Sequence, residues 1–521
     1  MRVRVAWRRW PLVIYPFLAA AYPVLSLAAA NGDDVTHAGL LVRPLLISFG
    51  VAAAVWSLAL PIVRDPHRRG LLVLLAVLCI AWYDRWVHAL TGSPFADLAY
   101  LGLAFPIWIA TTGWLGSLVV RARRDLAAVT RFLNLMALAM LAFPLFAMGR
   151  AARLARIEPL PLEVTPVRAM DAPPPDVYLI IVDEYSASRS LASLYHYDNS
   201  AFEDALRARG FAVPRQANAN YVHTFLSLAS MLNWTYLDTA VARLGEDRTD
   251  KRALYPWIES SRAFRFFAAQ GYEFVFLRSA YEPIRVNRHA DVLVPREGRA
   301  IGEFHEVWFG TTLLARSQWL TDLLVPRWGP ETEAGRESAD VMNARFAWLA
   351  QIAEPSDRPR LVFAHFLLPH DPFIYRADCS SRETPLLVPT LVDEPSERAG
   401  QLYVEQVECV NRRLLAVVDS ILARSARPPV LLIQSDHGNG MLGRPHSALA
   451  EMSAERIEDR LGIFAAYHLP GTDPDDVPDT IEPVDLFPLV LNRYFGTSLT
   501  SRGGRSYWSE WETPFRFVQV R

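Results

Sequence analysis

Residues 428–438 read PPVLLIQSDHG, and this stretch decides the fold. Four branched apolar residues at 430–433 stand between a proline pair and a polar end that contains Asp436 and His437. Such a continuous apolar run is typical of a strand buried on both faces, as in the middle of a parallel sheet. Ligands of open α/β sheets bind just beyond the carboxyl ends of the strands. Asp436 and His437 offer an oxygen and a nitrogen ligand for a divalent metal there, although such a pair also occurs as plain turn residues.

A second stretch has the same arrangement. Residues 176–184 read DVYLIIVDE, in which six apolar residues are followed by Asp183 and Glu184. Because the carboxyl ends of parallel strands meet at one edge of a sheet, two such strands would bring four potential ligands to one spot. The predicted metal ligands are Asp183, Glu184, Asp436 and His437.

The chain from residue 176 onward alternates between strand and helix patterns. That alternation predicts an α/β domain with a mostly parallel central sheet. No GxxxxGK[ST] loop, GxSxG elbow or convincing GxGxxG occurs, which removes the common nucleotide-binding and serine-hydrolase interpretations. Further strands are expected at 273–277, 361–366 and 462–468, and helices at 199–209, 260–269, 337–352 and 399–424.

Thr224 lies where another helix is expected to begin. From this residue onward Phe225, Leu228, Met231 and Leu232 have helical spacing. A hydroxyl at the start of a helix usually caps the helix, and the residues alone favour that role. The alternative is a nucleophile, placed where the helix dipole and free backbone N–H groups receive an anionic phosphoryl group.

Three histidines are candidates for contact with a substrate. His365 and His370 lie around the end of the strand expected at 361–366. His446 follows His437 by nine residues, on an expected loop. Each of the three, taken alone, is more often a hydrogen-bonded structural residue.

The first 150 residues hold long apolar runs. Five segments of about 20 residues, the length that spans a bilayer, fall at 11–30, 44–63, 71–90, 98–120 and 131–149. Arginines precede the first segment, as in a signal peptide, but the four further segments favour a retained anchor. Basic loops alternate with non-basic ones, which places the N-terminus in the cytoplasm and everything after about residue 150 on the far side. Asp84 and Arg85 make the third segment the weakest of the five.

The sequence thus divides into a transmembrane domain at 1–150, a proline-rich linker at 151–175 and a soluble domain at 176–521. The formal net charge of −2 and the lack of a clustered basic face give no reason to expect nucleic acid. The three cysteines do not make a disulfide scaffold. Cys379 and Cys409 either bridge in an oxidising compartment or stay as free thiols.

The order of the motifs resembles the alkaline phosphatase and sulfatase superfamily. The strand ending in Asp183, then Thr224, then LPHDPF and SDHG follow one another as in that superfamily, and the resemblance covers roughly residues 174–500. With the amino-terminal spans, the layout is most similar to membrane enzymes that include lipoteichoic acid synthases and lipid A phosphoethanolamine transferases. The resemblance implies a multi-pass protein of the bacterial inner (cytoplasmic) membrane, with its catalytic domain on the periplasmic or extracellular side.

The resemblance also implies roles for the matching residues. Thr224 matches the threonine that these transferases use as covalent nucleophile and metal contact, and Asp183, Asp436 and His437 match metal ligands. Glu184 stands where sulfatases often have a second acid. The implied cofactor is a divalent metal ion, with zinc, manganese and magnesium left undistinguished. His370 resembles a histidine that contacts substrate, and His446 a later histidine near the transferred group.

The implied reaction moves a phosphoethanolamine-type or phosphoglycerol-type headgroup from a phospholipid donor to an envelope glycan or lipid acceptor, through phosphothreonine at Thr224. The run after Thr224 lacks the C/S-x-P-x-R sequence that sulfatases convert to formylglycine, so sulfate ester hydrolysis by that route is not expected. Two alternatives stay open. One is a metal-dependent phosphodiesterase or phosphatase in which water replaces the acceptor. The other is an inactive domain that serves as a sensor or assembly partner in the envelope.

Overall fold

The computed structural model describes most of the chain. The described residues are 12–30, 39–91, 103–122, 125–153, 157–162, 174–279, 281–285, 287–294, 308–316, 339–352, 356–386, 396–440 and 449–521. The chain divides into two compact units, one made of residues 1–154 and 299–332 and the other of residues 155–298 and 333–521. We call them the helical unit and the α/β unit, and each is described by itself.

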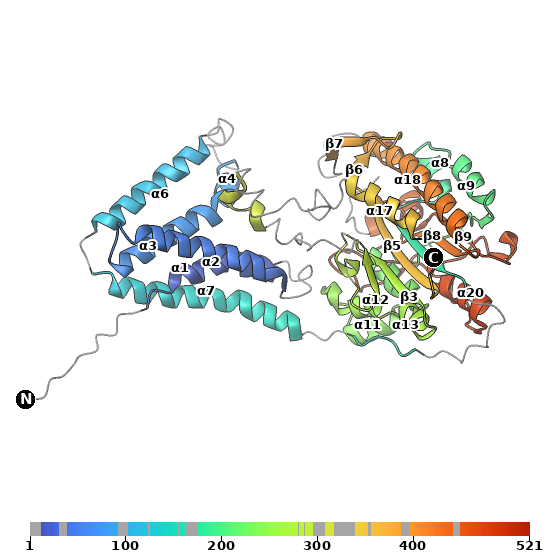
Figure 1. Cartoon of the computed structure of the whole chain (residues 1–521), viewed down its shortest axis with the longest axis horizontal. Helices are drawn as coiled ribbons and strands as arrows, with labels where there is room; N and C mark the ends of the chain where they lie inside the picture. Colours follow the sequence, from blue (N-terminus) through green and yellow to red (C-terminus); the bar gives the residue numbers. More distant parts are fainter. Residues whose placement is uncertain are drawn as a thin grey trace, which may run out of the picture. The chain divides into compact units, whose positions relative to one another are not determined.

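A seven-stranded sheet forms the centre of the α/β unit (Figure 1). Its strands are β1 (Val177–Asp183), β2 (Phe211–Ala212), β3 (Glu273–Leu277), β4 (Val292–Val294), β5 (Arg360–Pro369), β8 (Val430–Ser435) and β9 (Ala465–His468). They lie in the order β2-β9-β8-β1-β5-β3-β4. The central strand β1 pairs in parallel with β5 and β8, and only β9 pairs in antiparallel fashion with its neighbours. The predicted α/β domain with a mostly parallel sheet is confirmed.

Both faces of this sheet are covered, because successive side chains of a strand point to opposite faces. Leu179 and Ile181 of β1 belong to a buried cluster with the helices on one face, and Tyr178 and Ile180 belong to a second cluster with the helices on the other. On the first face lie α10 (Thr224–Met231), α12 (Tyr255–Glu259), α13 (Arg262–Ala269) and α20 (Pro483–Phe495), and on the second lie α9 (Ser200–Arg207), α17 (Ala339–Gln351) and α18 (Ser396–Arg424) (Figure 1).

Shorter elements complete the α/β unit. Two small antiparallel pairs, β6 with β7 and β10 with β11, lie outside the main sheet. The cysteine that follows β6, Cys379, is bonded through a disulfide to Cys409 in α18, which settles the pairing that the sequence left open. These elements are β6 (Phe373–Tyr375), β7 (Ser381–Leu386), β10 (Tyr507–Trp508), β11 (Val518–Gln519), α8 (Ser188–Leu194), α11 (Asp238–Leu244) and α19 (Ala454–Leu461).

Part of the predicted linker is packed against the α/β unit. Ile157 and Leu160 are buried in the cluster that covers the first face of the sheet. Ile157 N donates to the carbonyl of Ala253 at 3.1 Å, and the Trp257 indole donates to the carbonyl of Glu158 at 2.9 Å. Residues 157–162 of the predicted linker therefore group with the α/β unit.

The helical unit consists of apolar helices around α1. The contacts of α1 with α2, α3 and α7 hold the unit together. Within the described residues, two helices, α2 and the 127–150 part of α7, are long and apolar enough to cross a membrane, and the apolar α1 is shorter. The predicted number of five spans stays a prediction. The helices are α1 (Tyr15–Ala30), α2 (Gly39–Ala59), α3 (Pro66–Ala81), α4 (Tyr83–Thr91), α6 (Ala104–Arg121) and α7 (Ala127–Arg153).

The third predicted span, 71–90, is divided in the structure. Helix α3 ends at Ala81, Trp82 forms its C-cap, and α4 begins at Tyr83. Arg85 lies over the Trp82 ring at 4.9 Å, so the charged residues follow the break. The predicted span over 71–90 thus covers parts of two helices, and its crossing of a membrane stays a prediction.

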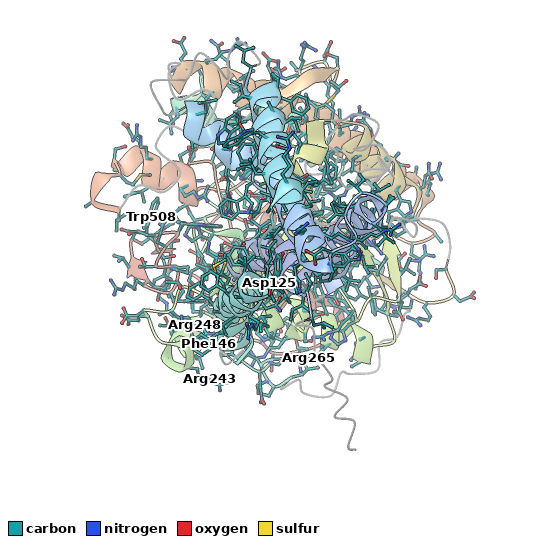
Figure 2. All side chains as sticks on the ribbon, turned by 90° about the vertical axis from the view of Figure 1, so that its left-hand side faces the viewer. Asp125, Phe146, Arg243, Arg248, Arg265 and Trp508 are labelled. Atoms are coloured by element: carbon teal, nitrogen blue, oxygen red, sulfur yellow. A yellow bond between two sulfur atoms is a disulfide. The ribbon has the colours of Figure 1, made fainter. Side chains whose placement is uncertain are left out.

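The outer surface of α7 is apolar. Phe132, Phe143 and Phe146 are 63%, 76% and 72% exposed, and Figure 2 labels Phe146. Exposed large apolar side chains on one helix are unusual for a protein surface in water and are typical of contact with lipid.

Replacing both Cys379 and Cys409 with serine removes a crosslink that spans 30 residues. A loop of this length is expected to contribute about 3–4 kcal/mol through the entropy of the unfolded chain. The double variant should melt at a lower temperature than the wild-type protein under oxidising conditions, and the difference should vanish in reducing buffer. Cys79→Ala, which removes the unpaired cysteine, serves as the control. Equal melting temperatures in oxidising and reducing buffer would contradict a structural disulfide.

Candidate metal centre

The two sequence motifs end side by side. β1 and β8 are neighbouring parallel strands in which Val182 pairs with Ser435, so Asp183 and Asp436 follow at the same edge of the sheet. Ser435 ties the two strand ends together, because its Oγ accepts a hydrogen bond from Tyr185 N at 2.9 Å. The backbone N–H of Glu184 donates to Asp436 Oδ1 at 3.3 Å. The register of the sheet therefore brings the two carboxylates together.

Asp183, Asp436 and His437 form a buried group with the chemistry of a metal site. Their ligand atoms all lie within 4.8 Å of one another, and each residue is 2% exposed. His437 Nε2 is 3.3 Å from Asp436 Oδ2 and 3.9 Å from Asp183 Oδ1. His437 Nδ1 lies 3.1 Å from the carbonyl of Gly438. A proton on Nδ1 would donate to that carbonyl and leave the lone pair of Nε2 facing the carboxylates.

Thr224 brings a hydroxyl to this group. It is the first residue of α10, and its Oγ1 lies 3.1 Å from His437 Nε2. His223 occupies the N-cap position and makes no side-chain cap hydrogen bond. Thr224 is therefore not the cap of its helix, which removes the role that the residues alone favoured. The start of α10 supplies the positive end of a helix dipole to the hydroxyl.

Burial changes the pKa values of these groups. Burial, with the Asp436 carboxylate beside it, raises the pKa of Asp183 well above its usual range. Burial raises the pKa of Asp436 to about 6, although the Thr224 hydroxyl beside it acts in the opposite direction. Burial and the Arg460 guanidinium lower the pKa of His437 well below its usual range, so its imidazole is neutral. Raised carboxylate pKa values and a lowered imidazole pKa are expected in a buried metal-binding site that holds no cation.

The donor set fits a divalent metal ion. Asp183 Oδ1 and Asp436 Oδ2 are buried and accept no hydrogen bond from any residue in the described part of the chain. Buried carboxylate oxygens without a partner are costly, and a cation would satisfy both. Two carboxylate oxygens, one imidazole nitrogen and one hydroxyl suit zinc, manganese or magnesium to different degrees, and they do not select one. The residues that would hold the ion are Asp183, Thr224, Asp436 and His437.

Glu184 lies at the edge of this group and has a different partner. Its backbone has a φ of 59°, which turns the chain sharply after β1. Its carboxylate forms an ion pair with the Arg460 guanidinium, and His370 Nε2 is 3.9 Å from the same Oε1 atom. Glu184 is not part of the group of three that could hold a metal, so its predicted role as a ligand stays a prediction.

The three predicted substrate histidines differ in their surroundings. His370 is partly exposed, with 37% of its side chain accessible. Burial would lower the pKa of His370, but the Glu184 and Asp371 carboxylates outweigh it and raise the pKa well above its usual value. His365 is fully buried, with Nδ1 3.2 Å from Ser279 Oγ and Nε2 3.7 Å from Asp183 Oδ2. His365 therefore faces Asp183, one of the predicted metal ligands. His446 lies outside the described residues.

Arg460 is the residue of this site that the sequence interpretation missed. It lies in α19, a helix that was not predicted, and its Nε donates to the carbonyl of Val222 at 2.9 Å. Its Nη1 lies 3.3 Å from the carbonyl of Gly438, and its Nη2 is 3.5 Å from His437 Nε2. One guanidinium thus connects the loop before Thr224, the turn after His437 and the carboxylate of Glu184. An arginine in a polar helix carries no sequence signal for such a role.

Gly438 lets the end of α19 approach the Asp436–His437 turn. Its N–H donates to the carbonyl of Arg460 at 2.8 Å. A Cβ atom at this position would lie 1.8 Å from the carbonyl oxygen of Asp459 and 2.5 Å from that of Gly462. Both obstacles are backbone atoms, which have no room to move aside. The glycine in the SDHG run is therefore required by packing.

Gly438→Ala is expected to destabilise the protein by at least about 2 kcal/mol and to displace His437, because the new methyl group overlaps backbone. Gly440→Ala is the matched control, since a Cβ there meets only the Arg460 side chain, at 3.4 Å. Thermal unfolding and metal content of the two variants check this. Equal melting temperatures for both variants would contradict the packing requirement.

Metal content tests the centre directly. Purified protein is expected to hold about one divalent ion per chain, and Asp436→Asn should lose it because one of the charged ligands becomes neutral. Asp419→Asn is the control, since Asp419 pairs with Arg209 at the surface. The measurement is elemental analysis of each variant after gel filtration in metal-free buffer. Retention of a full equivalent by Asp436→Asn would exclude this residue as a ligand.

Comparisons with known proteins found no matching family model and no matching curated protein. Solved structures do match. The integral membrane lipooligosaccharide phosphoethanolamine transferase A of Neisseria meningitidis is 14% identical over 92% of this chain and 94% of that chain, with a TM-score of 0.42. The zinc complex of the C-terminal periplasmic domain of EcEptC from Escherichia coli is 12% identical over 68% of this chain and 96% of that chain, with a TM-score of 0.44. A Vibrio parahaemolyticus protein described as in the alkaline phosphatase superfamily is 12% identical over 69% of this chain and 79% of that chain, with a TM-score of 0.39.

Proposed function

We propose that this protein is a membrane-bound, metal-dependent transferase. It moves a phosphoethanolamine-type or phosphoglycerol-type headgroup from a phospholipid to an acceptor hydroxyl on an envelope glycan or lipid. The observation that carries the proposal is the position of the Thr224 hydroxyl, 3.1 Å from His437 Nε2 and beside the buried carboxylate of Asp436. A hydroxyl held against a metal-type donor set at the start of a helix is arranged for attack on phosphorus.

The proposed reaction has two steps. Thr224 Oγ1 attacks the phosphorus of the phosphodiester, the bond to the glycerol oxygen breaks, and diacylglycerol leaves with a proton. The acceptor hydroxyl then attacks the phosphothreonine, and the oxygen of Thr224 leaves as its hydroxyl is restored. A divalent cation bound at the site would lower the pKa of the Thr224 hydroxyl and balance charge on the phosphoryl oxygens. Asp183 and Asp436 would hold this cation beside the Thr224 hydroxyl.

Two basic residues support the handling of a phosphate group. The Arg460 guanidinium lies 3.5 Å from His437 Nε2, so a positive charge borders the space in front of Thr224. A fixed guanidinium stabilises charge that develops on transferring oxygens without having to move. His370 is partly exposed and, with its raised pKa, carries a proton near neutral pH. That proton would be available to the glycerol oxygen as it leaves.

The compartment proposed is the outer side of the cytoplasmic membrane. The Cys379–Cys409 disulfide forms and persists in oxidising surroundings, which favours the periplasmic or extracellular side for the α/β unit. The apolar helices of the other unit would keep the enzyme at the bilayer, where a phospholipid donor is presented. A lipid donor gives a reason for joining such a domain to membrane helices.

Thr224→Ala is expected to lower headgroup transfer at least about 10³-fold, because the group that forms the covalent intermediate is lost. Thr224→Ser keeps a hydroxyl and should retain measurable transfer. The assay uses full-length protein in proteoliposomes with labelled phosphatidylethanolamine or phosphatidylglycerol. Mass spectrometry of wild-type protein, quenched during turnover, should find the headgroup phosphate on the peptide containing Thr224.

The same experiment separates the proposed function from its alternatives. Release of free headgroup at an unchanged rate without any acceptor would favour a phosphodiesterase. Full transfer by Thr224→Ala would refute the nucleophile. An envelope sensor or assembly protein would show neither modification of Thr224 nor turnover in the wild-type chain.

A further inference from the structure

The helical unit contains a pocket that the chemistry at Thr224 does not involve. Three helices form its walls, and its fourth side comes from residues 308–316. This segment lies in the sequence between β4 and α17, within the α/β half of the chain, but it belongs to the helical unit. The predicted soluble domain at 176–521 stays a prediction, since the described residues 308–316 group with the helical unit. The lining residues are Ala20 and Pro23 of α1, Ile47, Ser48 and Val51 of α2, Val77, Ile80 and Ala81 of α3, and Trp308, Thr312 and Leu314.

Residues 308–316 pack closely on the helices, and we call them the cover segment. Trp308 and Phe309 are each 3% exposed and are buried against Val24, Ala28 and Leu41. The aromatic side chains of the segment therefore sit where the ends of α1 and α2 meet. A short helical turn, η3 (Leu313–Arg316), continues along α3.

The two threonine hydroxyls of the cover segment are bonded to the segment's own backbone. Thr311 Oγ1 donates to the carbonyl of Trp308 at 2.7 Å, and Thr312 Oγ1 donates to the carbonyl of Phe309 at 2.7 Å. Hydroxyls bonded to their own backbone carry little desolvation cost and leave apolar surface to face the helices. A sequence with two threonines and an aromatic pair can thus lie on membrane helices.

The pocket has the character of a hydrocarbon site. It is a shallow apolar hollow that is open to its surroundings on one side. Nearly all the side chains that line it are alanine, valine, isoleucine, leucine, proline or tryptophan. No charged residue is among them, which excludes a phosphate or a metal ion as the occupant.

The lining residues lie deep along their helices. Pro23 is eight residues into α1, and Val51 is twelve residues into α2, which correspond to about 12 and 18 Å at 1.5 Å per residue. Ala81 is the last residue of α3. With the orientation predicted from the loop charges, Pro23 and Val51 fall near the middle of the bilayer and Ala81 falls in its outer half. The surroundings at these depths are hydrocarbon.

We propose that this pocket holds one acyl chain of the donor phospholipid, with the cover segment closing over it. The choice of donor rests on the proposed function. A chain bound there touches three membrane helices and, through Trp308 and Leu314, a segment covalently continuous with the domain that carries Thr224. Lipid tails are as apolar as the pocket wall, so moving an acyl chain from the bilayer into the pocket gains little free energy. The pocket would therefore position the lipid without binding it tightly. It would favour diacyl donors over single-chain or short-chain ones.

Photo-crosslinking in proteoliposomes tests the proposal. The probes are phosphatidylethanolamine and phosphatidylglycerol that carry a diazirine in one acyl chain, and the protein is the full chain with Thr224→Ala, so that the donor is not consumed. Mass spectrometry should find crosslinks on the peptides of α1, α3 and residues 308–316. Crosslinks at the exposed Phe143 and Phe146 of α7 report the surrounding lipid and serve as the internal reference.

Val51→Phe fills the pocket, and Ala53→Phe, on an exposed face of α2, is the matched control. Val51→Phe should lower the crosslinks at 308–316 about threefold to tenfold relative to those at α7, since only packing is lost. In the chain that keeps Thr224, Val51→Phe should raise KM for diacyl donors with little change in kcat. The KM for a soluble dihexanoyl donor should not change. Ala53→Phe should change neither, and equal melting temperatures show that both variants fold.

Two outcomes would overturn the proposal. One is a ratio of crosslinks at 308–316 to those at α7 that is the same for Val51→Phe and Ala53→Phe. The other is an equal effect of Val51→Phe on diacyl and dihexanoyl donors. The crosslinking does not depend on turnover. If Val51→Phe lowers the crosslinks but Thr224→Ala transfers headgroup normally, the lipid pocket stands and the proposed chemistry fails.

Discussion

The structure of the site depends on the repulsion between two buried carboxylates. The ligand atoms of Asp183, Asp436 and His437 lie within 4.8 Å of one another and away from water. Two negative charges at that separation repel by roughly 3–4 kcal/mol at an effective dielectric constant of about 20. Protonation or a cation relieves this repulsion. Burial raises the pKa of both acids, and for Asp183 the neighbouring Asp436 carboxylate adds to the effect. With the neutral His437 imidazole beside them, the acids are arranged for a cation.

The fold maintains this costly arrangement through the backbone. Parallel pairing of β1 with β8 sets the two acids at one edge, and the left-handed turn at Glu184 carries the chain away from them. The start of α10 brings Thr224 from the first face of the sheet. Arg460 then bonds to the carbonyl of Val222, before Thr224, and to the carbonyl of Gly438, after His437. As the proposed nucleophile, a hydroxyl positioned in this way would need little rearrangement during reaction.

The fold and the site were not equally predictable. Fully buried strands leave a continuous apolar run, so β1, β5 and β8 were recognisable, and with them Asp183 and Asp436 at their ends. The residues alone favoured Thr224 as the N-cap, but His223 occupies that position. The spacing of apolar residues locates the start of a helix only to within one or two residues. Arg460 and the cover segment were missed, since contacts between distant parts of a chain leave no local pattern. Trp308 in particular lies among soluble-domain sequence and yet packs on α1 and α2.

Anomalous X-ray diffraction from crystals of the full-length protein, collected above and below the absorption edge of zinc or manganese, tests the central claim most directly. The account predicts one strong peak at about 2.0–2.3 Å from Asp183, Asp436, His437 Nε2 and Thr224 Oγ1, the usual metal–ligand distance. A site without a peak, in which Asp183 and Asp436 share a proton in crystals grown with the metal, would contradict it.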